Sequence, residues 1–263
     1  MKKLAIFFGL PVLLAAVGCG SEDNEARLII KLVDSPAAYE AVNVDIRGIR
    51  VHSSDAAGEN EGGWVDLSGS DVGVVNLLDY TGGTELTLVD TRFPEGRISQ
   101  IRLLLGDDNS VVVGGDARSL MTPSAQQSGL KLNVHETLLA GITYEFLLDF
   151  DAARSVVRTG NSMFILKPVI RVITRTLSGA IKGEVMPAAE NVAVYALMGQ
   201  DTLGSSYAPA GQSSFMVSGL PEGRYQLVLD PGSESAFTVL SLSDVDVTTG
   251  QVTDLGQKNL MPK

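Results

Sequence analysis

Short apolar runs, separated by glycine- and proline-containing segments, limit this chain to a sheet architecture. Several runs alternate apolar with polar side chains, as at Val42, Val44 and Ile46. Alternation with a period of two is typical of strands with one buried face, because successive side chains point to opposite sides of the strand. No segment after residue 18 carries a long apolar stripe at helical spacing. We therefore expect an all-β fold built of β-sandwiches.

Local patterns refine this expectation. The alternation changes phase after Gly48, which predicts a β-bulge there. Residues 106–109 have the composition of a turn and predict a hairpin between the two apolar runs that flank them. Helical structure is expected to be limited to one or two turns, at residues 37–41 and 151–157.

The N-terminus has a different pattern. Lys2 and Lys3 precede an apolar run that ends at Val17, which is the layout of a secretory signal peptide. The run is too short to span a bilayer comfortably, and no stop-transfer segment follows it. Residues 1–18 are therefore predicted to be a signal peptide, which leaves the rest of the chain as the exported protein.

Residues 14–19 read Leu-Ala-Ala-Val-Gly-Cys and resemble a bacterial lipobox. The resemblance implies cleavage before Cys19, a diacylglyceryl group on its thiol, and an acyl chain such as palmitate on its new amine. The mature chain is then expected to be a lipoprotein whose acylated Cys19 lies in a lipid bilayer. Residues 19–26 would form a polar tether. The alternative is an ordinary signal-peptide cysteine with cleavage nearby.

The residues after Cys19 bear on the destination. Gly20 stands where an aspartate would retain a lipoprotein at the inner membrane of enteric bacteria. Glu22 and Asp23 resemble the acidic export signal of Bacteroidetes-type surface lipoproteins, although solubilising charge in a tether is an equal explanation. We expect lipid anchoring at the cell outer membrane, with the periplasmic and the surface-facing orientation both open.

The charge of the chain excludes some partners. Its formal net charge is −11, and loss of Lys2 and Lys3 with the signal peptide makes the mature chain −13. An acidic chain without a basic run is not expected to bind nucleic acid or to dock electrostatically on anionic lipid. Cys19 is the only cysteine, so an intramolecular disulfide is excluded.

Six phrases in the first part of the chain, taken in order, resemble the domain-of-unknown-function 4382 (DUF4382) family of bacterial and archaeal lipoproteins. They are Leu32-Val33-Asp34-Ser35-Pro36, Trp64, Val75-Asn76-Leu77-Leu78-Asp79, Pro94-Glu95-Gly96 with Gln100-Ile101-Arg102-Leu103, Leu148-Asp149-Phe150-Asp151, and Leu166-Lys167-Pro168-Val169-Ile170. The resemblance covers about residues 26–173. It implies an envelope lipoprotein with a sandwich-like fold and implies no activity. We assign residues 27–174 to this domain.

A second pattern follows. Gly179 and Gly183 flank a short apolar run, and the phrase Gly219-Leu220-Pro221-Glu222-Gly223-Arg224-Tyr225 has the composition of a turn. These residues resemble the carboxypeptidase regulatory-like domain, a small transthyretin-like sandwich, over residues 177–260. The resemblance implies a spacer or binding platform without catalytic zinc ligands. The expected fold class is thus all-β, with two β-sandwich domains in series after a lipoprotein signal peptide.

Few side chains suggest chemistry. Asp149 and Asp151 would lie on one side of a strand and, with Asp34, could bind Ca²⁺ through oxygen ligands. The favoured alternative is that the three aspartates cap turns, so no cofactor or metal is predicted. His52 and His135 stand far apart without a second histidine or cysteine at ligand spacing, and are expected at the surface or the core edge.

Trp64 and Arg102 are the remaining candidates. Trp64 follows a glycine-rich loop and could stack on a sugar or on a partner side chain, but packing in the core is the favoured interpretation. Arg102 lies in an apolar run and is expected to pair with a carboxylate, either Asp79 or Asp149, because an unpaired buried charge is costly.

The functional expectation is a non-enzymatic, membrane-anchored envelope lipoprotein that binds a glycan or an envelope protein. One alternative is a structural spacer or assembly protein of the envelope. Another is a metal-dependent hydrolase in which acidic residues perform acid–base catalysis. An exposed Trp64 favours binding, and convergence of the three aspartates would favour metal or catalysis.

Overall fold

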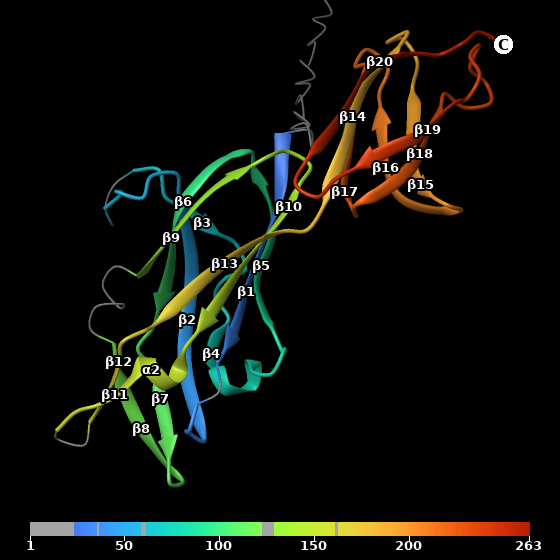
Figure 1. Ribbon diagram of the computed structural model, residues 1–263. Helices are drawn as coiled ribbons and strands as arrows, with labels where there is room; N and C mark the ends of the chain where they lie inside the picture. Colours follow the sequence, from blue (N-terminus) through green and yellow to red (C-terminus); the bar gives the residue numbers. More distant parts are fainter. Residues whose placement is uncertain (1–23, 36, 59–61, 123–128, 161–162) are drawn as a thin grey trace, which may run out of the picture.

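The computed structural model describes residues 24–35, 37–58, 62–122, 129–160 and 163–263. Nearly all of its regular structure is β (Figure 1), which confirms the predicted all-β, sandwich-type fold class. The strands fall into two groups along the chain, each made of two sheets. The bounds of the proposed domains, 27–174 and 177–260, stay predictions.

The first group contains β1 (Glu25–Asp34), β2 (Ala41–His52), β3 (Val65–Leu67), β4 (Gly73–Asn76), β5 (Leu86–Pro94), β6 (Gly96–Leu105), β7 (Ser110–Val113), β8 (Asp116–Met121), β9 (Leu130–Leu138), β10 (Thr143–Phe150), β11 (Val156–Arg158), β12 (Phe164–Leu166) and β13 (Ile170–Thr176). Two helical turns interrupt it, η2 (Leu77–Tyr80) and α2 (Ala152–Ser155). The second group contains β14 (Gly179–Met186), β15 (Val192–Met198), β16 (Asp201–Ala208), β17 (Ser214–Leu220), β18 (Gly223–Asp230), β19 (Leu240–Val247) and β20 (Val252–Asn259).

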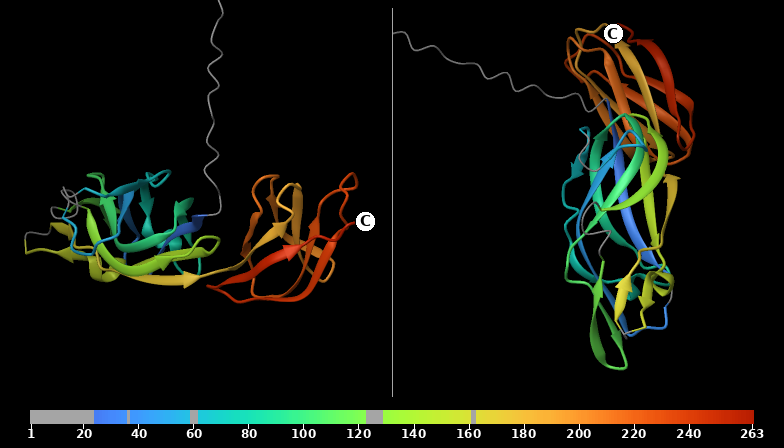
Figure 2. Two further views of the ribbon diagram at one scale, coloured as in Figure 1. Left: turned by 90° about the horizontal axis from the view of Figure 1, so that it is seen from above. Right: turned by 90° about the vertical axis from the view of Figure 1, so that its left-hand side faces the viewer.

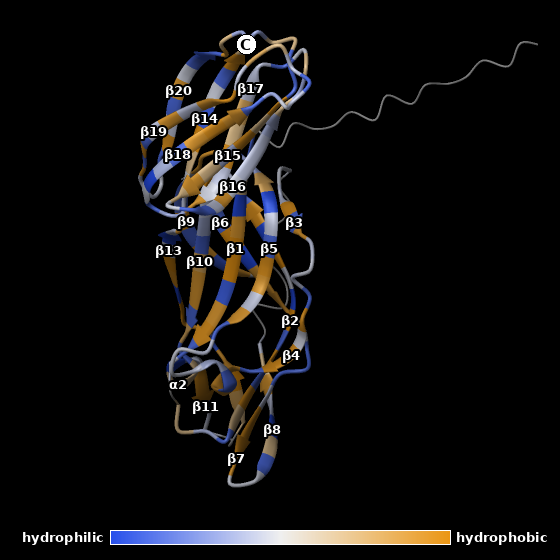
Figure 3. Cartoon of the chain, turned by 90° about the vertical axis from the view of Figure 1, so that its right-hand side faces the viewer, coloured by the Kyte–Doolittle hydropathy of each residue, from blue (hydrophilic) through white to orange (hydrophobic). Residues whose placement is uncertain are grey.

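A four-stranded sheet and a nine-stranded sheet form the first group. The smaller sheet has the order β13-β10-β1-β5, and the larger has β11-β12-β8-β7-β2-β6-β9, with β3 and β4 also paired to β2. β1 is central: it runs parallel to β10 and antiparallel to β5. Bands of hydrophobic and hydrophilic residues alternate along β1 in Figure 3, as a strand with one buried face requires.

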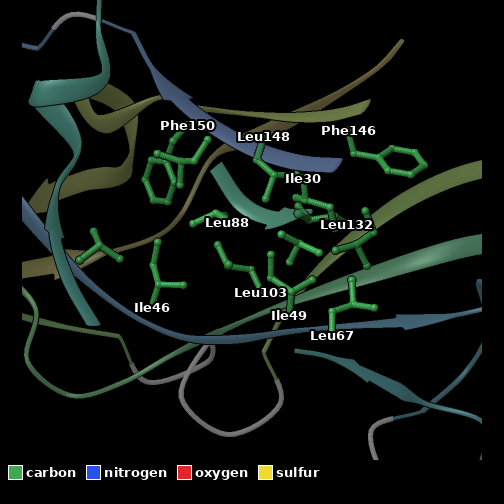
Figure 4. Packing of buried hydrophobic residues seen from close by; sticks show 14 of the residues in the cluster. Ile30, Ile46, Ile49, Leu67, Leu88, Leu103, Leu132, Phe146, Leu148 and Phe150 are labelled. Atoms are coloured by element: carbon green, nitrogen blue, oxygen red, sulfur yellow. The ribbon is translucent and has the colours of Figure 1, made fainter. Parts of the chain in front are cut away.

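The core of the first group lies between these two sheets. Phe146, Leu148 and Phe150 from β10 meet Ile46 and Ile49 from β2 across the layer (Figure 4), and all five are at most 1 % exposed. Full burial of each such side chain stabilises the fold by about 1.5–3 kcal/mol. The alternating pattern at the start of β2 therefore predicted correctly which of its side chains are buried in the core.

The phase change in β2 is a bulge. The register of β2 against β6 shifts between Ile46 and Gly48, so the predicted β-bulge at Gly48 is confirmed. It lets Ile46 and Ile49 both reach the core although they are three positions apart.

The hairpin predicted at residues 106–109 is wrong. β6 and β7 both pair with β2, one after the other, so the chain jogs and continues along β2 without reversing. Two hydrogen bonds fix residues 106–109 to the buried Asp45. The Asp45 carbonyl oxygen accepts from the Gly106 N–H (2.8 Å), and the Asp45 N–H donates to Asn109 Oδ1 (2.8 Å). Turn composition shows where the chain bends, but it does not show which strand is the partner.

One of the two helical predictions is confirmed and the other is wrong. α2 confirms a helical turn within residues 151–157. Residues 37–41 bend into β2 without a helix, because the Glu40 N–H already donates to Val112 O of the sheet (3.1 Å). In the described ranges, no helix has the length and apolar character needed to cross a bilayer.

The second group has a three-stranded sheet, β17-β14-β20, and a four-stranded sheet, β16-β15-β18-β19. Its separate core includes Ile181, Val194, Phe215, Leu227 and the fully buried Tyr225. The Tyr225 hydroxyl donates to Pro221 O (2.9 Å), which satisfies its only polar atom inside the core.

A packed junction joins the two groups, which follow one another along the long axis of the molecule (Figure 2). The Leu177 N–H donates to Thr143 O (2.8 Å), and the Thr143 N–H donates to Ser178 Oγ (2.8 Å). The Gly219 N–H of β17 donates to Gly141 O (3.1 Å). Backbone and side-chain hydrogen bonds therefore cross the junction at several points.

Candidate functional site

Trp64 lies on the outer side of the nine-stranded sheet, immediately before β3. Its side chain is half-buried and is a member of neither hydrophobic core. The indole Nε1–H donates to Gly58 O (2.9 Å), which fixes the ring against the preceding loop. The favoured interpretation of the sequence was that Trp64 packs in the core, whereas the structure places it outside both cores.

Two arginines lie against the indole. The guanidinium carbons of Arg50 and Arg102 are each 5.5 Å from the Trp64 ring centroid. They are neighbours because Arg50 of β2 stands directly opposite Arg102 of β6 in the ladder, with both side chains on the outer face. Arg50 Nε also lies 2.7 Å from Asp66 Oδ1 of β3. Cation–π attraction and an ion pair together order this part of the face.

His52 supports the ring from a second side. Its ring centroid is 5.0 Å from that of Trp64, at an angle of 53°. His52 Nδ1 accepts from the Ser54 N–H (2.8 Å), so the hydrogen of the neutral ring is on Nε2, which donates to Gly62 O (3.0 Å). His52 thereby joins the two described ends of the loop between β2 and β3, at the core edge where the sequence placed it.

The next strands fasten the loop to the sheet. Gln100 Nε2 on β6 lies 3.3 Å from Ser54 O, 3.3 Å from Asp55 O and 3.4 Å from Ala57 O, while Gln100 Oε1 accepts from Arg102 Nε (2.7 Å). Lys131 Nζ on β9 also donates to Asp55 O. Side chains from two strands therefore hold the loop from below.

We call this surface the Trp64 patch and define it by Arg50, Trp64, Arg102 and Lys131; the buried side chains of His52 and Gln100 lie beneath it. The sequence argument found Trp64 but missed Arg50, Gln100 and Lys131. Arg50, Arg102 and Lys131 stand in one row across three neighbouring strands. Only the strand register reveals that row, because the three residues are distant in sequence. The arrangement can present an aromatic ring beside several hydrogen-bond donors.

The three candidate aspartates come together at one end of the four-stranded sheet. Asp34 ends β1, and its parallel partner β10 carries Asp149 and leads into Asp151. Asp34 is 6 % exposed; its Oδ1 accepts from the Ala152 N–H (2.9 Å), and its Oδ2 is buried without a partner. Burial, followed by the nearby charges of Asp151 and Asp149, raises the pKa of Asp34 from 3.8 to about 6.

The other two aspartates have structural partners. Asp149 pairs with Arg171 of β13, and Asp151 caps α2 by accepting from the Arg154 N–H (2.9 Å). No three His, Cys, Asp or Glu side chains of the described residues form a group that could hold a metal ion. The geometry is that of turn and helix caps, and the Ca²⁺ hypothesis gains no support from it.

The remaining predicted residues are dispersed. His135 is exposed on β9, 3.9 Å from Asp55 Oδ2. Arg102 does not pair with Asp79 or Asp149: it bonds Gln100 and Gly129 O (3.2 Å), because its side chain points to the outer face and away from the apolar layer. Cys19, the predicted lipidation site, lies outside the described residues.

A family model described as Domain of unknown function (DUF4382) matches residues 25–168. The match covers more than half of the chain, so the chain belongs to the DUF4382 family. This confirms the first of the two sequence resemblances, and the second stays a prediction. No curated protein matches the chain significantly.

Several solved structures show a weak likeness. The Bacillus anthracis TIE protein is 12 % identical with a TM-score of 0.23; the match covers 90 % of this chain, which spans about a third (34 %) of that protein. The major pilin from Streptococcus pyogenes is 9 % identical with a TM-score of 0.19, covering 91 % of this chain and 98 % of the pilin. A fimbrial protein from Bacteroides ovatus is 8 % identical with a TM-score of 0.25, covering 91 % of this chain and 50 % of that protein. TM-scores this low do not define a shared fold.

Proposed function

We propose that this chain is a non-catalytic binding module of the cell envelope that holds a glycan on the Trp64 patch. An aromatic ring can stack on the apolar face of a sugar, while flanking donors bond the sugar hydroxyls. The patch offers both kinds of group on one sheet face, with Trp64 against Arg50 of β2 and Arg102 of β6, and with Lys131 of β9 next in the same row.

The observation that carries the proposal is the position of Trp64 outside both cores. A large aromatic side chain stabilises a fold most when it is fully buried. Trp64 instead stays partly exposed on the outer face, held by two guanidinium groups, an imidazole and the Gly58 carbonyl. These contacts pre-organise the ring, which lowers the entropy lost when a ligand binds.

Trp64 is the only tryptophan, so intrinsic fluorescence reports on this patch alone. We expect saturable quenching or a shift of its emission when the chain is titrated with one or more members of a panel of neutral and acidic oligosaccharides. Trp64→Ala is expected to weaken capture on the same immobilised glycans at least tenfold, which is about 1.4 kcal/mol. Tyr195→Ala, an exposed aromatic of the second group, is the matched control and should bind normally.

The same variants separate binding from a purely structural role. Trp64→Phe keeps an aromatic ring but loses the bond to Gly58 O, so it should fold and retain part of the affinity. If no glycan changes the fluorescence, or if Trp64→Ala and Tyr195→Ala lose capture equally, the glycan proposal is wrong. In that case immobilised envelope proteins are the next ligands to test.

A structural spacer is the second candidate, and the junction favours it. Hydrogen bonds among Gly141, Thr143, Leu177, Ser178 and Gly219 hold the two groups together. As a spacer, the chain would lose its role when the junction is loosened and would keep it in Trp64→Ala. Comparing the envelope phenotype of Gly141→Ala with that of Trp64→Ala therefore distinguishes the two functions.

The anchor is a proposal of its own, supported by the lipobox-like sequence. We infer that acylated Cys19 holds the chain on the outer membrane. Cys19→Ala should move the protein from the membrane to the soluble fraction, and protease treatment of intact cells should show which side it faces. A Cys19→Ala variant that still fractionates with membranes would overturn the anchor.

A further inference from the structure

The strand β16 forms an edge of the four-stranded sheet in the second group. In the part of the chain that the structure describes, its backbone forms hydrogen bonds only with β15. A free edge presents unpaired N–H and C=O groups, which can accept a further strand unless charges or a cover prevent it.

Other edges are protected. Charged residues stand on β5, β9, β11, β13, β19 and β20, namely Asp90, Arg92, Lys131, Glu136, Arg158, Arg171, Arg175, Asp244, Asp246, Asp254 and Lys258. The uncharged edge strand β17 is covered at the junction, where the Gly219 N–H bonds Gly141 O and Met216 packs against the first core. β16 carries a single charge, Asp201 at its start, in a chain whose net charge is −11.

The outer face of β16 is also apolar. Leu203 and Tyr207 are 44 % and 54 % exposed, and Tyr195 beside them on β15 is 38 % exposed. Gly204 faces inward, because a Cβ there would lie 2.8 Å from Val217 Cγ1, and Ala208 is buried. Leu203, Ser205 and Tyr207 therefore all point outward, although the bulge at Leu203 ends the regular stretch.

We propose that β16 pairs antiparallel with β16 of a second copy of this chain around a two-fold axis at Ser205. In this register Ser205 faces Ser205 of the second copy, and each Leu203 faces the Tyr207 of the other copy. All three pairs lie on the same outer face, and the paired stretch contains no charge. The outward order apolar, small, apolar at Leu203, Ser205 and Tyr207 reads the same in both directions, so a second copy can meet it with apolar against apolar and Ser against Ser.

The test uses the full chain carrying Cys19→Ser, which removes the only thiol and the acylation site. Because the paired surface is small, dissociation constants between micromolar and millimolar are expected. Sedimentation velocity between ~5 and ~500 µM protein should therefore show a shift from monomer toward dimer. Ser205→Lys places two like charges opposite one another and should weaken the dimer at least tenfold. Ser241→Lys, on the same outer face at the β19 edge, should leave it unchanged.

Cross-linking checks the register. In the Cys19→Ser chain, Ser205→Cys should form a disulfide-linked dimer on mild oxidation, because residues facing each other on adjacent strands bring their Cβ atoms within disulfide reach. Ser241→Cys should not. A chain that stays monomeric at ~500 µM overturns the proposal. So does a dimer insensitive to Ser205→Lys, or equal cross-linking at both positions.

Discussion

Asp34→Asn tests the most perturbed carboxyl group of the first sandwich. Asp34 has a folded-state pKa of about 6 against an ordinary value of 3.8, because burial disfavours its charged form. A raised carboxyl pKa means that the folded state binds the proton more tightly than the unfolded state. The contribution of Asp34 to stability is therefore greatest at low pH and is lost as the pH rises from 3.8 to about 6.

The size of this effect follows from the shift. Because one pKa unit corresponds to 1.36 kcal/mol, a pKa raised from 3.8 to about 6 sets an upper bound of ~3 kcal/mol, which solvent screening reduces. Asn keeps the acceptor for the Ala152 N–H and carries no charge, so it avoids this loss. Its amide nitrogen occupies the position of the unpartnered Oδ2, which costs part of the gain. We expect Asp34→Asn to be more stable than the wild type by about 1–2 kcal/mol at pH 7.5.

Urea unfolding from pH 3.5 to 8, followed by Trp64 fluorescence, measures the difference directly, since Trp64 lies in the same group of strands. The gain of Asp34→Asn should vanish or reverse below pH 4. Asp90→Asn is the control of opposite sign, because the bond from Arg27 lowers the pKa of Asp90 and the Asp90 contribution is lost on acidification. Parallel stability profiles for Asp34→Asn and the wild type would refute the argument.

Three further perturbations test the fold. Glu145→Ala removes a buried carboxylate that lies 2.8 Å from Lys31 Nζ and 3.2 Å from Arg175, and should cost about 2 kcal/mol in urea unfolding; a loss below 0.5 kcal/mol would contradict the pairing. Tyr225→Phe should lose about 1 kcal/mol with the hydrogen bond to Pro221 O, as measured by thermal unfolding of the second group. Gly141→Ala adds a Cβ 2.7 Å from Met216 Sδ at a φ of 78°, so it should destabilise the chain by about 1–3 kcal/mol and increase protease cleavage near the junction. Unchanged cleavage would show that Gly141 does not stabilise the junction.

Local alternation was sufficient to predict much of the fold. The period-two pattern predicted the all-β class and the bulge at Gly48, because both depend on which side chains a single strand buries. The path of the chain at residues 106–109, which continues along β2 without reversing, could not be predicted in this way. Whether a turn reverses the chain depends on the length of the partner, and β2 is long enough to pair with β6 and β7 in succession.

The candidate site was predictable only in part. The sequence indicated Trp64 as a candidate because it is an isolated aromatic residue after a glycine-rich loop. Its neighbours could not be predicted, because they depend on the register of β2, β6 and β9. Arg102 was expected to need a carboxylate because its strand is apolar, whereas it points to the outer face and contacts Trp64 and Gln100. Sequence shows which residues are charged, and the side of the sheet decides what they can contact.

The central position of β1 has a consequence for the order of folding. β1 starts the described chain, yet its parallel partner lies more than a hundred residues later, with Leu28 opposite Tyr144. Such distant pairing makes closure of the sheet slow, because a long loop must be ordered before the contacts form. The first sheet cannot close until β10 has been synthesised. An emerging chain can pair β1 with β5 early, but the other edge of β1 stays open until β10 has been synthesised.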